Sequence, residues 1–210
     1  HWIEAHILPG EKLTHTFREV TYETASRAGE PFEAMIVARS FLPNPVMRIC
    51  TQELKIRPMK KFAQEVLGFV NWTNVIGLRA DEPRRVAKTK APNREAWENE
   101  TPLADAGVTL ADVTTFWREQ AFDLRLRPHE GNCDLCFLKG RARIERILRE
   151  RPDLAAWWVR QEEHRFGVGD DARFRHDRPS YARMLRVVQA TPYLPGLGFD
   201  DDALPCACTD

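Results

Sequence analysis

The residues of this sequence best placed to act chemically together are two cysteines in a short polar turn. Cys133 and Cys136 stand three positions apart in Gly131-Asn132-Cys133-Asp134-Leu135-Cys136. This spacing directs two thiols to one point, and a soft metal ion or an iron–sulfur cluster needs about four thiolate or imidazole ligands. A helix is predicted directly after the pair, so a redox dithiol at a helix N-terminus is a second interpretation. Two small buried apolar residues in a turn are the third.

Three further cysteines, Cys50, Cys206 and Cys208, lie far from this pair in the sequence. Five cysteines without framework spacing argue against a disulfide scaffold, so reduced thiols and a cytoplasmic location are expected. A dithiol acting alone would leave these three cysteines unexplained. We therefore expect a composite site of Cys50, Cys133, Cys136 and a tail cysteine, Cys206 or Cys208.

His129 is the histidine nearest to Cys133 in the sequence. A solvent-exposed loop histidine is the favoured interpretation, and a metal ligand or a group supporting one is the alternative. The usual phosphate-loop, dinucleotide-binding and serine-hydrolase motifs do not occur in this sequence.

Positive charge is concentrated in one segment of a chain whose formal net charge is zero. Residues 48–94 hold eleven Lys and Arg against four Asp and Glu, whereas residues 195–210 hold four Asp and no Lys or Arg. Arginine grips phosphate or sulfate with two parallel hydrogen bonds, so this segment predicts an anionic ligand. The alternative is a solvated basic face that the acidic tail covers. The candidate anion-binding residues are Arg48, Lys55, Arg79, Arg84 and Arg85.

The composition fits a globular protein with a core, at 43% apolar and 30% charged residues. A length of 210 residues predicts one domain with an appended subdomain. No apolar run approaches the length of a membrane span, and no secretory signal is visible. Zero net charge gives no overall field that would recruit nucleic acid or a membrane.

The elements that must position these residues follow from periodicity and from Pro and Gly. A strand is expected at residues 1–7, a second extended piece at 17–22, and a helix at 24–40 that breaks near Gly29. Pro58 is placed in the first turn of a helix that Gly68 ends. The best strand is 71–78, with Val75 and Ile76 buried.

The second half of the chain is expected to be mostly helical. Residues 88–102 are predicted to form a polar loop. Thr109 is predicted to cap a helix to about residue 120, with Val113, Phe116 and Trp117 facing inward. The other expected helices cover residues 138–151, 154–166 and 180–190.

Three motifs in this order resemble the phosphoadenosine phosphosulfate (PAPS) reductase family, in its phage and bacterial branch. They are Arg48-x-Cys50-Thr51-x-x-Leu54-Lys55-x-x-Pro58, then Val75-Ile76-Gly77-Leu78-Arg79-Ala80-Asp81-Glu82-x-x-Arg85, then Gly131-Asn132-Cys133-Asp134-Leu135-Cys136. The resemblance implies an α/β fold of the adenine nucleotide α-hydrolase type, a parallel sheet flanked by helices. It divides the chain into a nucleotide-binding-like core, residues 1–130, and a helical extension with an acidic cysteine-containing tail, residues 131–210.

The resemblance also implies the site residues. Arg79, Glu82 and Arg85 would line a pocket for the nucleotide and its phosphosulfate, with Arg48 and Lys55 beside it. Cysteines at the positions of Cys50, Cys133 and Cys136 bind a [4Fe–4S] cluster in cluster-bearing members. Those members have a Cys-Cys pair where this chain has Ile49-Cys50, so a tail cysteine is our substitute for the missing ligand. The resemblance also implies a catalytic cysteine near the C-terminus, and Cys206 or Cys208 is the alternative candidate for that role. The family's Ser-Gly-Gly-x-x-Ser phosphate loop is absent and would precede His1, so the fold is expected to be N-terminally incomplete.

Two classes of function follow from this resemblance and from the cysteines. The first is an enzyme that acts on an adenylylated or phosphosulfate nucleotide by sulfur transfer or reduction, with an iron–sulfur cluster and an electron-donor protein as partner. A variant in this class is a sulfurtransferase component that modifies nucleic acid. The second class is a non-catalytic interaction module that zinc or a cluster stabilises.

Overall fold

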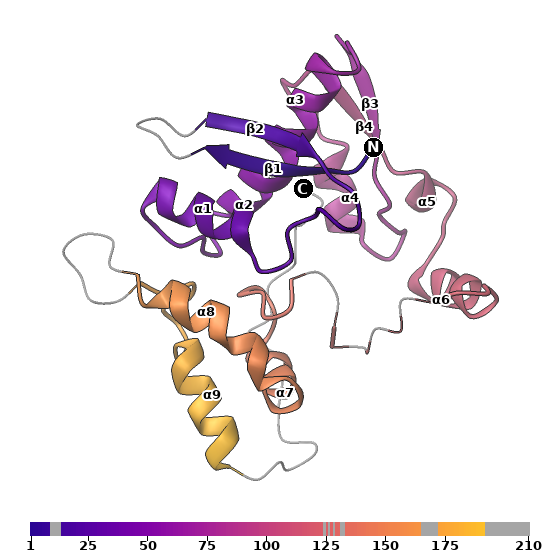
Figure 1. The fold of residues 1–210 in the computed structure, drawn as a ribbon. Coiled ribbons are helices and arrows are strands. Elements are labelled where there is room, and N and C mark those ends of the chain that lie inside the picture. Colours follow the sequence, from indigo (N-terminus) through magenta and orange to yellow (C-terminus); the bar gives the residue numbers. More distant parts are fainter. Residues whose placement is uncertain are drawn as a thin grey trace. The chain divides into compact units, whose positions relative to one another are not determined.

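The protein is described here by a computed structural model, which describes residues 1–8, 14–123, 125, 127, 129–130, 133–164 and 172–191. It is a mixed α/β protein whose described residues contain two small sheets of two strands each and several helices (Figure 1). The chain forms two compact units. The first joins His1–Phe62 to the described residues that follow Leu126, and the second covers 63–125.

A β-hairpin begins the first unit. Strand β1 (Ile3–Leu8) pairs antiparallel with β2 (Thr14–Glu19), and Ala5 and Ile7 of β1 are buried. The expected first strand is thus confirmed, whereas the second extended piece lies about three residues earlier than expected. The predicted turn at Pro9-Gly10 lies outside the described residues.

Helix α1 (Glu30–Arg39) begins only after Gly29, so the expected helix from residue 24 is shorter at its start. Gly29 has a φ of +90°, a backbone conformation that residues with a Cβ rarely adopt. A Cβ on Gly29 would also lie 2.5 Å from Nε1 of Trp157. From this start, α1 buries Met35 and Ile36 completely.

A helical stretch of three successive pieces carries Cys50. They are α2 (Ile49–Thr51), the π-helical segment η1 (Gln52–Ile56) and α3 (Arg57–Glu65). The expectation that Pro58 lies in the first turn of a helix is confirmed for α3. Helical backbone already runs from Ile49, however, so Pro58 does not stand at the start of the whole stretch. Proline has no N–H and its ring clashes with the carbonyl four residues back, and the wider π turn just before Pro58 accommodates both effects. The N–H of Arg57 donates accordingly to the carbonyl of Gln52, five residues back.

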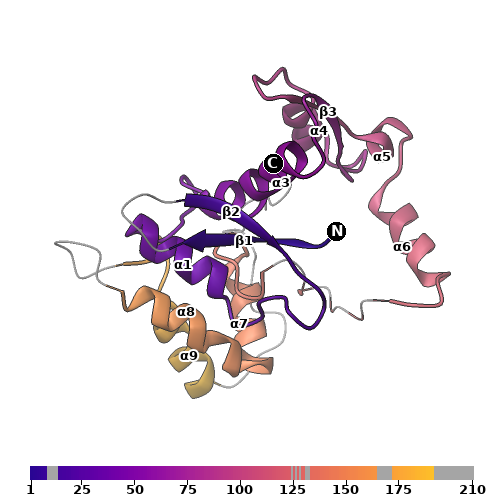
Figure 2. The same cartoon turned by 45° about the horizontal axis from the view of Figure 1, so that its top comes forward.

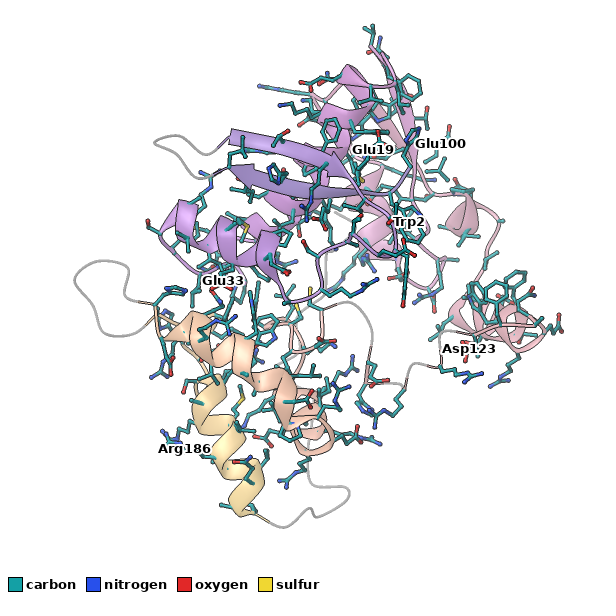
Figure 3. All side chains as sticks on the ribbon, viewed as in Figure 1. Trp2, Glu19, Glu33, Glu100, Asp123 and Arg186 are labelled. Atoms are coloured by element: carbon teal, nitrogen blue, oxygen red, sulfur yellow. The ribbon has the colours of Figure 1, made fainter. Side chains whose placement is uncertain are left out.

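The C-terminal helices of the first unit are α7 (Arg141–Glu150), the short 3₁₀ segment η2 (Pro152–Leu154), α8 (Ala155–Glu162) and α9 (Tyr181–Ala190). Helix α9 packs against both α7 and α8. In both views α8 lies beside α1 (Figures 1 and 2). Glu33 of α1 pairs there with Arg160 of α8, at 3.2 Å (Figure 3). The three helices expected in this region are confirmed, with α7 starting three residues later than expected.

One core joins these parts of the first unit. It contains Ile7 of β1, residues of α1, the turn around Cys136 and the inner faces of α7, α8 and α9. Aromatic rings fill its centre, contributed by Phe32, Phe137, Trp157, Trp158, Phe174 and Tyr181. The division of the chain therefore differs from the boundary expected at residue 130, since the helices after 140 share a core with the N-terminal hairpin and α1.

The second unit is built on a parallel pair of strands. Strand β3 (Trp72–Val75) pairs in parallel with β4 (Trp97–Glu100), and α4 (Pro83–Thr89) lies between them in the sequence. The expected strand at 71–78 is confirmed in part. The prediction of a polar loop at residues 88–102 is wrong, because this segment contains β4. Its alternation of intermediate and exposed residues is the pattern of a strand with one covered face.

Two short helices complete the second unit, α5 (Pro102–Asp105) and α6 (Leu110–Arg118). Thr109 caps α6 as expected, in a capping box with Asp112. The inward positions expected for Val75, Phe116 and Trp117 are wrong, because these side chains are 68%, 55% and 42% exposed. Ile76 and Val113, which were also expected inside, are partly buried. The rings of Phe116 and Trp117 contact each other, with their centroids 5.3 Å apart.

None of the helices in the described residues has the length and apolar character needed to cross a membrane.

Candidate functional site

Cys50 and Cys133 come close together in the first unit although they are far apart in the sequence. Cys50 is half-buried in α2, and Cys133 is exposed in the turn before α7. Burial raises the pKa of the Cys50 thiol, and the nearby Cys133 raises it further, whereas Lys55 acts in the opposite direction. Burial and a second negative charge both disfavour a free thiolate, so the site favours two neutral thiols, or thiolates whose charge a bound cation balances.

Cys136 belongs to the core rather than to the surface. It is 6% exposed and packs in the cluster that Cys50 also contacts. Its N–H donates to the carbonyl of Cys133 at 3.4 Å, which closes the turn. The next turn is closed by Lys139, whose N–H donates to the carbonyl of Cys136 at 2.9 Å. The two cysteines of the turn therefore differ, since one faces solvent and the other faces the core.

Positive charge surrounds these thiols. Lys55 and Lys139 both interact with the cysteines, and burial lowers the pKa of Lys139 while Cys136 and Asp134 oppose that effect. The turn also leads directly into α7, whose N-terminus begins after Gly140. A helix N-terminus carries partial positive charge, so these groups partly offset the effect of burial on the thiols.

The donor set suits a soft metal ion in kind, since thiols are the ligands that zinc and iron–sulfur clusters use. Within the described part of the chain, however, no three Cys, His, Asp or Glu side chains are grouped closely enough to hold a metal ion. Cys206 and Cys208, the expected fourth ligands, lie outside the described residues. Of the expected composite site, the described residues therefore contain the approach of Cys50 to Cys133.

His129 is buried, at 5% exposed, so the expectation of a solvent-exposed loop histidine is wrong. Its Nε2 lies 2.7 Å from Glu150 at the end of α7, and its Nδ1 is buried with no hydrogen-bond partner among the described residues. The contact with Glu150 explains the burial, because it pairs the ring with a carboxylate. It ties the segment before the cysteine turn to α7.

The expected anion-binding residues fall into both units. Arg48 and Lys55 belong to the first unit, where Nε of Arg48 donates to the carbonyl of Pro45 at 3.1 Å. Arg79, Glu82 and Arg85 belong to the second unit and lie together.

In the second unit, Glu82 joins the two arginines. It forms ion pairs with Arg79, at 3.4 Å, and with Arg85, and it accepts the backbone N–H of Arg79 at 3.2 Å. Arg79 also donates to Asp81 at 2.9 Å. This cluster follows β3 and leads into α4 at Pro83. Its two positive and two negative charges balance, so an anion would have to draw the arginines from their carboxylate partners.

The sequence did not reveal the side chains that hold the cysteine turn. Arg178 and Tyr181 donate to three carbonyls of that turn from about forty residues downstream. Arg178 precedes the helix expected at residues 180–190, and Tyr181 lies at the start of that helix. Only the burial of Arg178, at 7% exposed, marks it as more than a surface arginine. Burial of this kind depends on the tertiary fold, so no local pattern could have identified it.

Comparison with known proteins finds one partial relative. The chain is 38% identical over 95 residues to an "Uncharacterized nin region protein ORF290" of Escherichia phage lambda. The matched part covers 45% of this chain and 30% of the relative, so the chain spans about a third of that relative's length. The expected phage character agrees with this source. No family model and no solved structure matches the chain.

Proposed function

We propose that the protein is a PAPS reductase-like enzyme, acting on an adenylylated or phosphosulfate nucleotide with a cysteine-bound iron–sulfur cluster. The observation that carries this proposal is the approach of Cys50 to Cys133. Two thiols brought together from distant segments are one part of what a composite metal site requires, and Cys136 packs in the core that Cys50 contacts. A cytoplasmic location belongs to the same proposal, because it keeps such thiols reduced.

Cys50, Cys133 and Cys136 would hold the cluster, with Cys206 or Cys208 as the fourth ligand. When bound, a [4Fe–4S] cluster supplies a group that accepts and releases one electron. The chain's own contribution is electrostatic: Lys55, Lys139 and the N-terminus of α7 balance the negative charge of the thiolates. Burial of Cys136 keeps water from one side of the site.

The nucleotide would bind at the loop after β3. Glu82 pairs with both Arg79, in the loop after β3, and Arg85, in α4. A phosphate or sulfate group would accept hydrogen bonds from both, because a guanidinium presents several N–H donors in a fixed plane. In the finer form of this proposal, β3 and β4 belong to the parallel sheet of an adenine nucleotide α-hydrolase-like fold.

Anaerobic reconstitution with iron and sulfide tests the cluster. We expect a brown protein with broad visible absorption and about four irons per chain. Replacing Cys50, Cys133 or Cys136 with Ser should abolish the colour, and so should one of Cys206→Ser and Cys208→Ser. A colourless wild-type protein that takes up zinc instead would exclude the cluster.

Nucleotide binding is tested separately, by calorimetry with adenosine phosphosulfate and with PAPS. We expect the double variant Arg79→Ala with Arg85→Ala to weaken binding at least tenfold, because each charged contact contributes about 1.5–3 kcal/mol. Arg118→Ala removes an exposed arginine of the same unit and should leave the affinity unchanged. Equal binding by the double variant and the control would refute the pocket.

A zinc-stabilised interaction module is the second candidate, favoured by one observation. The turn that carries the cysteines is part of the core: Leu135, Phe137 and Leu138 are 0%, 1% and 4% exposed. Structural zinc sites characteristically hold such turns in place by binding their cysteines. Zinc uptake with full folding and no nucleotide binding would select this candidate over the enzyme.

A further inference from the structure

The turn that carries the two cysteines offers three backbone carbonyls to side chains from elsewhere in the first unit. The carbonyl of Leu135 accepts the hydroxyl of Tyr181. The carbonyls of Phe137 and Lys139 accept hydrogen bonds from Nη2 and Nη1 of Arg178, each at 2.8 Å. Two side chains that stand three positions apart thus hold every second carbonyl from 135 to 139.

These bonds fix the backbone on both sides of Cys136. The carbonyl of Leu135 belongs to the peptide group that precedes Cys136, and the carbonyl of Phe137 belongs to the peptide group one residue beyond it. With both anchored, and with the N–H of Cys136 bonded to Cys133, the dihedral angles of Cys136 have little freedom. They set the direction of its Cα–Cβ bond, and the burial of the side chain in the core restricts the remaining χ1 rotation of the thiol.

The two donors are themselves held in place. Arg178 and Tyr181 are 7% and 1% exposed, and the Tyr181 ring packs 5.1 Å from Trp158. Glu162 of α8 accepts the backbone N–H groups of Tyr181, at 2.7 Å, and of Phe174, at 3.4 Å. Burial also raises the pKa of the Tyr181 hydroxyl well above its usual value, so this hydroxyl remains a donor at any ordinary pH.

The N-termini of α7 and α9 come together at the turn as a result. Tyr181 is the first residue of α9, and α7 begins directly after the turn. The opposite ends meet as well, because Arg149 near the end of α7 donates to the carbonyls of Val188 and Thr191, both at 2.7 Å. The two helices therefore run in the same direction, with their positive ends towards the cysteine turn.

We propose that Arg178 and Tyr181 are positioning residues of the cysteine site, which hold the thiol of Cys136 in the direction that ligand binding requires. This inference rests on the proposed metal or cluster site for its purpose. Its physical content, a fixed Cys136, can be measured without any metal. In metal proteins, groups that orient the ligands typically change the affinity 10–100-fold when removed.

The test is residue-resolved alkylation of the metal-stripped, full-length protein under native conditions. Tyr181→Phe removes only the hydroxyl and keeps the buried ring. Arg178→Lys keeps the charge but loses the pair of guanidinium N–H groups that donates to two carbonyls. In the wild type, the exposed Cys133 should react faster than the buried Cys136. Each variant should raise the rate at Cys136 about tenfold, because a hydrogen bond of typical strength no longer opposes local opening.

Val188→Ala is the matched control. Val188 is a buried residue of the same helix, at 4% exposed, and its side chain lies beyond the contacts with the turn. Loss of its packing should raise the alkylation of Cys50 and Cys136 by the same factor, because it lowers global stability. The proposal is overturned if Tyr181→Phe affects Cys136 no more selectively than Val188→Ala does. Tyr181→Phe alone decides the matter if Arg178→Lys does not fold.

A second measurement connects the positioning to the site. Zn²⁺ affinity, measured by competition with a chelator, should fall about tenfold in Tyr181→Phe relative to Val188→Ala. Unchanged affinity in Tyr181→Phe overturns the positioning role. A wild-type protein that binds neither zinc nor a cluster refutes the proposed function instead, and the alkylation pattern still decides whether Arg178 and Tyr181 fix Cys136.

Discussion

At the scale of single residues, the site depends on thiols whose surroundings differ. Cys50 is half-buried, Cys133 is exposed and Cys136 is in the core. Because a thiolate is the reactive and metal-binding form, these differences predict different chemical behaviour for three residues of the same type. The pH dependence of Cys50 offers the most direct measurement.

Burial and the neighbouring Cys133 raise the pKa of Cys50, so its thiol keeps its proton to a higher pH in the folded protein than in the unfolded chain. We expect the midpoint of its alkylation rate against pH to lie above that of an unfolded peptide of the same sequence. The folded state then binds more protons in this range, so its stability falls as pH rises through the ordinary thiol pKa.

Two variants check the cause of this shift. Cys133→Ser should lower the midpoint for Cys50, whereas Lys55→Met should raise it, because these residues act in opposite directions. If the midpoint for Cys50 stays at the wild-type value in both variants, neither Cys133 nor Lys55 affects the charge on Cys50.

Gly29 is constrained in another way, because its backbone conformation and the neighbouring Trp157 both exclude a side chain. Gly29→Ala combines a φ of +90° with a Cβ that meets Trp157 at 2.5 Å, and should cost about 3 kcal/mol of unfolding free energy. Gly68→Ala is the matched control, since Gly68 has a φ of +69° and nothing lies within 4 Å of a Cβ there. It should cost about 1 kcal/mol. Equal losses in urea unfolding would show that the contact with Trp157 is relieved without strain.

At the scale of elements, the segment with Cys50 is attached to α1 by a buried carboxylate. Glu53 in η1 is 2% exposed and pairs with Arg39 of α1 and with Arg57, the latter at 3.0 Å. A buried charge is tolerated only with such partners. The π-helical segment therefore has both a cause, Pro58, and an anchor, Glu53, and together they determine where Cys50 is presented.

Glu53→Gln tests this anchor. The substitution keeps the shape and removes the charge, which leaves two arginines with weaker partners. We expect a loss of about 2 kcal/mol in urea unfolding, less than for a fully buried pair because both arginines are partly exposed. Glu163→Gln, at an exposed position of the same unit, should change the stability by less than about 0.5 kcal/mol. A loss as small as that of the control would mean that solvent screens the Glu53 pairs.

At the scale of the molecule, the two proposed binding sites belong to different compact units. The cysteines and the residues that hold them belong to the first unit, and the Arg79, Glu82 and Arg85 cluster belongs to the second. A ligand stabilises the part of the protein that binds it. Binding of the metal and of the nucleotide should therefore leave distinguishable signatures.

Metal or cluster loading should stabilise the first unit. At a free metal concentration about 100 times Kd, the gain is about 3 kcal/mol, and a chelator should reverse it. Hydrogen exchange should slow in residues 49–56 and 133–151, around the cysteines. Unchanged exchange there after confirmed metal uptake would place the metal elsewhere in the chain.

Local sequence determined the elements whose signals are local. The capping box at Thr109, the strand after Asn71 and the apolar face of α9 needed only neighbouring residues. The cysteine pair and its turn were visible in the same way. Strand β4 escaped because only four residues form it and the sequence around it is polar.

Tertiary structure alone decided which distant residues meet. Cys50 reaches Cys133, Glu53 is buried between arginines of two helical segments, and Arg178 and Tyr181 reach back to the cysteine turn. The same is true of the exposure of Phe116 and Trp117, which helical periodicity had turned inward. Periodicity identifies the apolar face of a helix, but whether another element covers that face depends on packing between segments far apart in the chain.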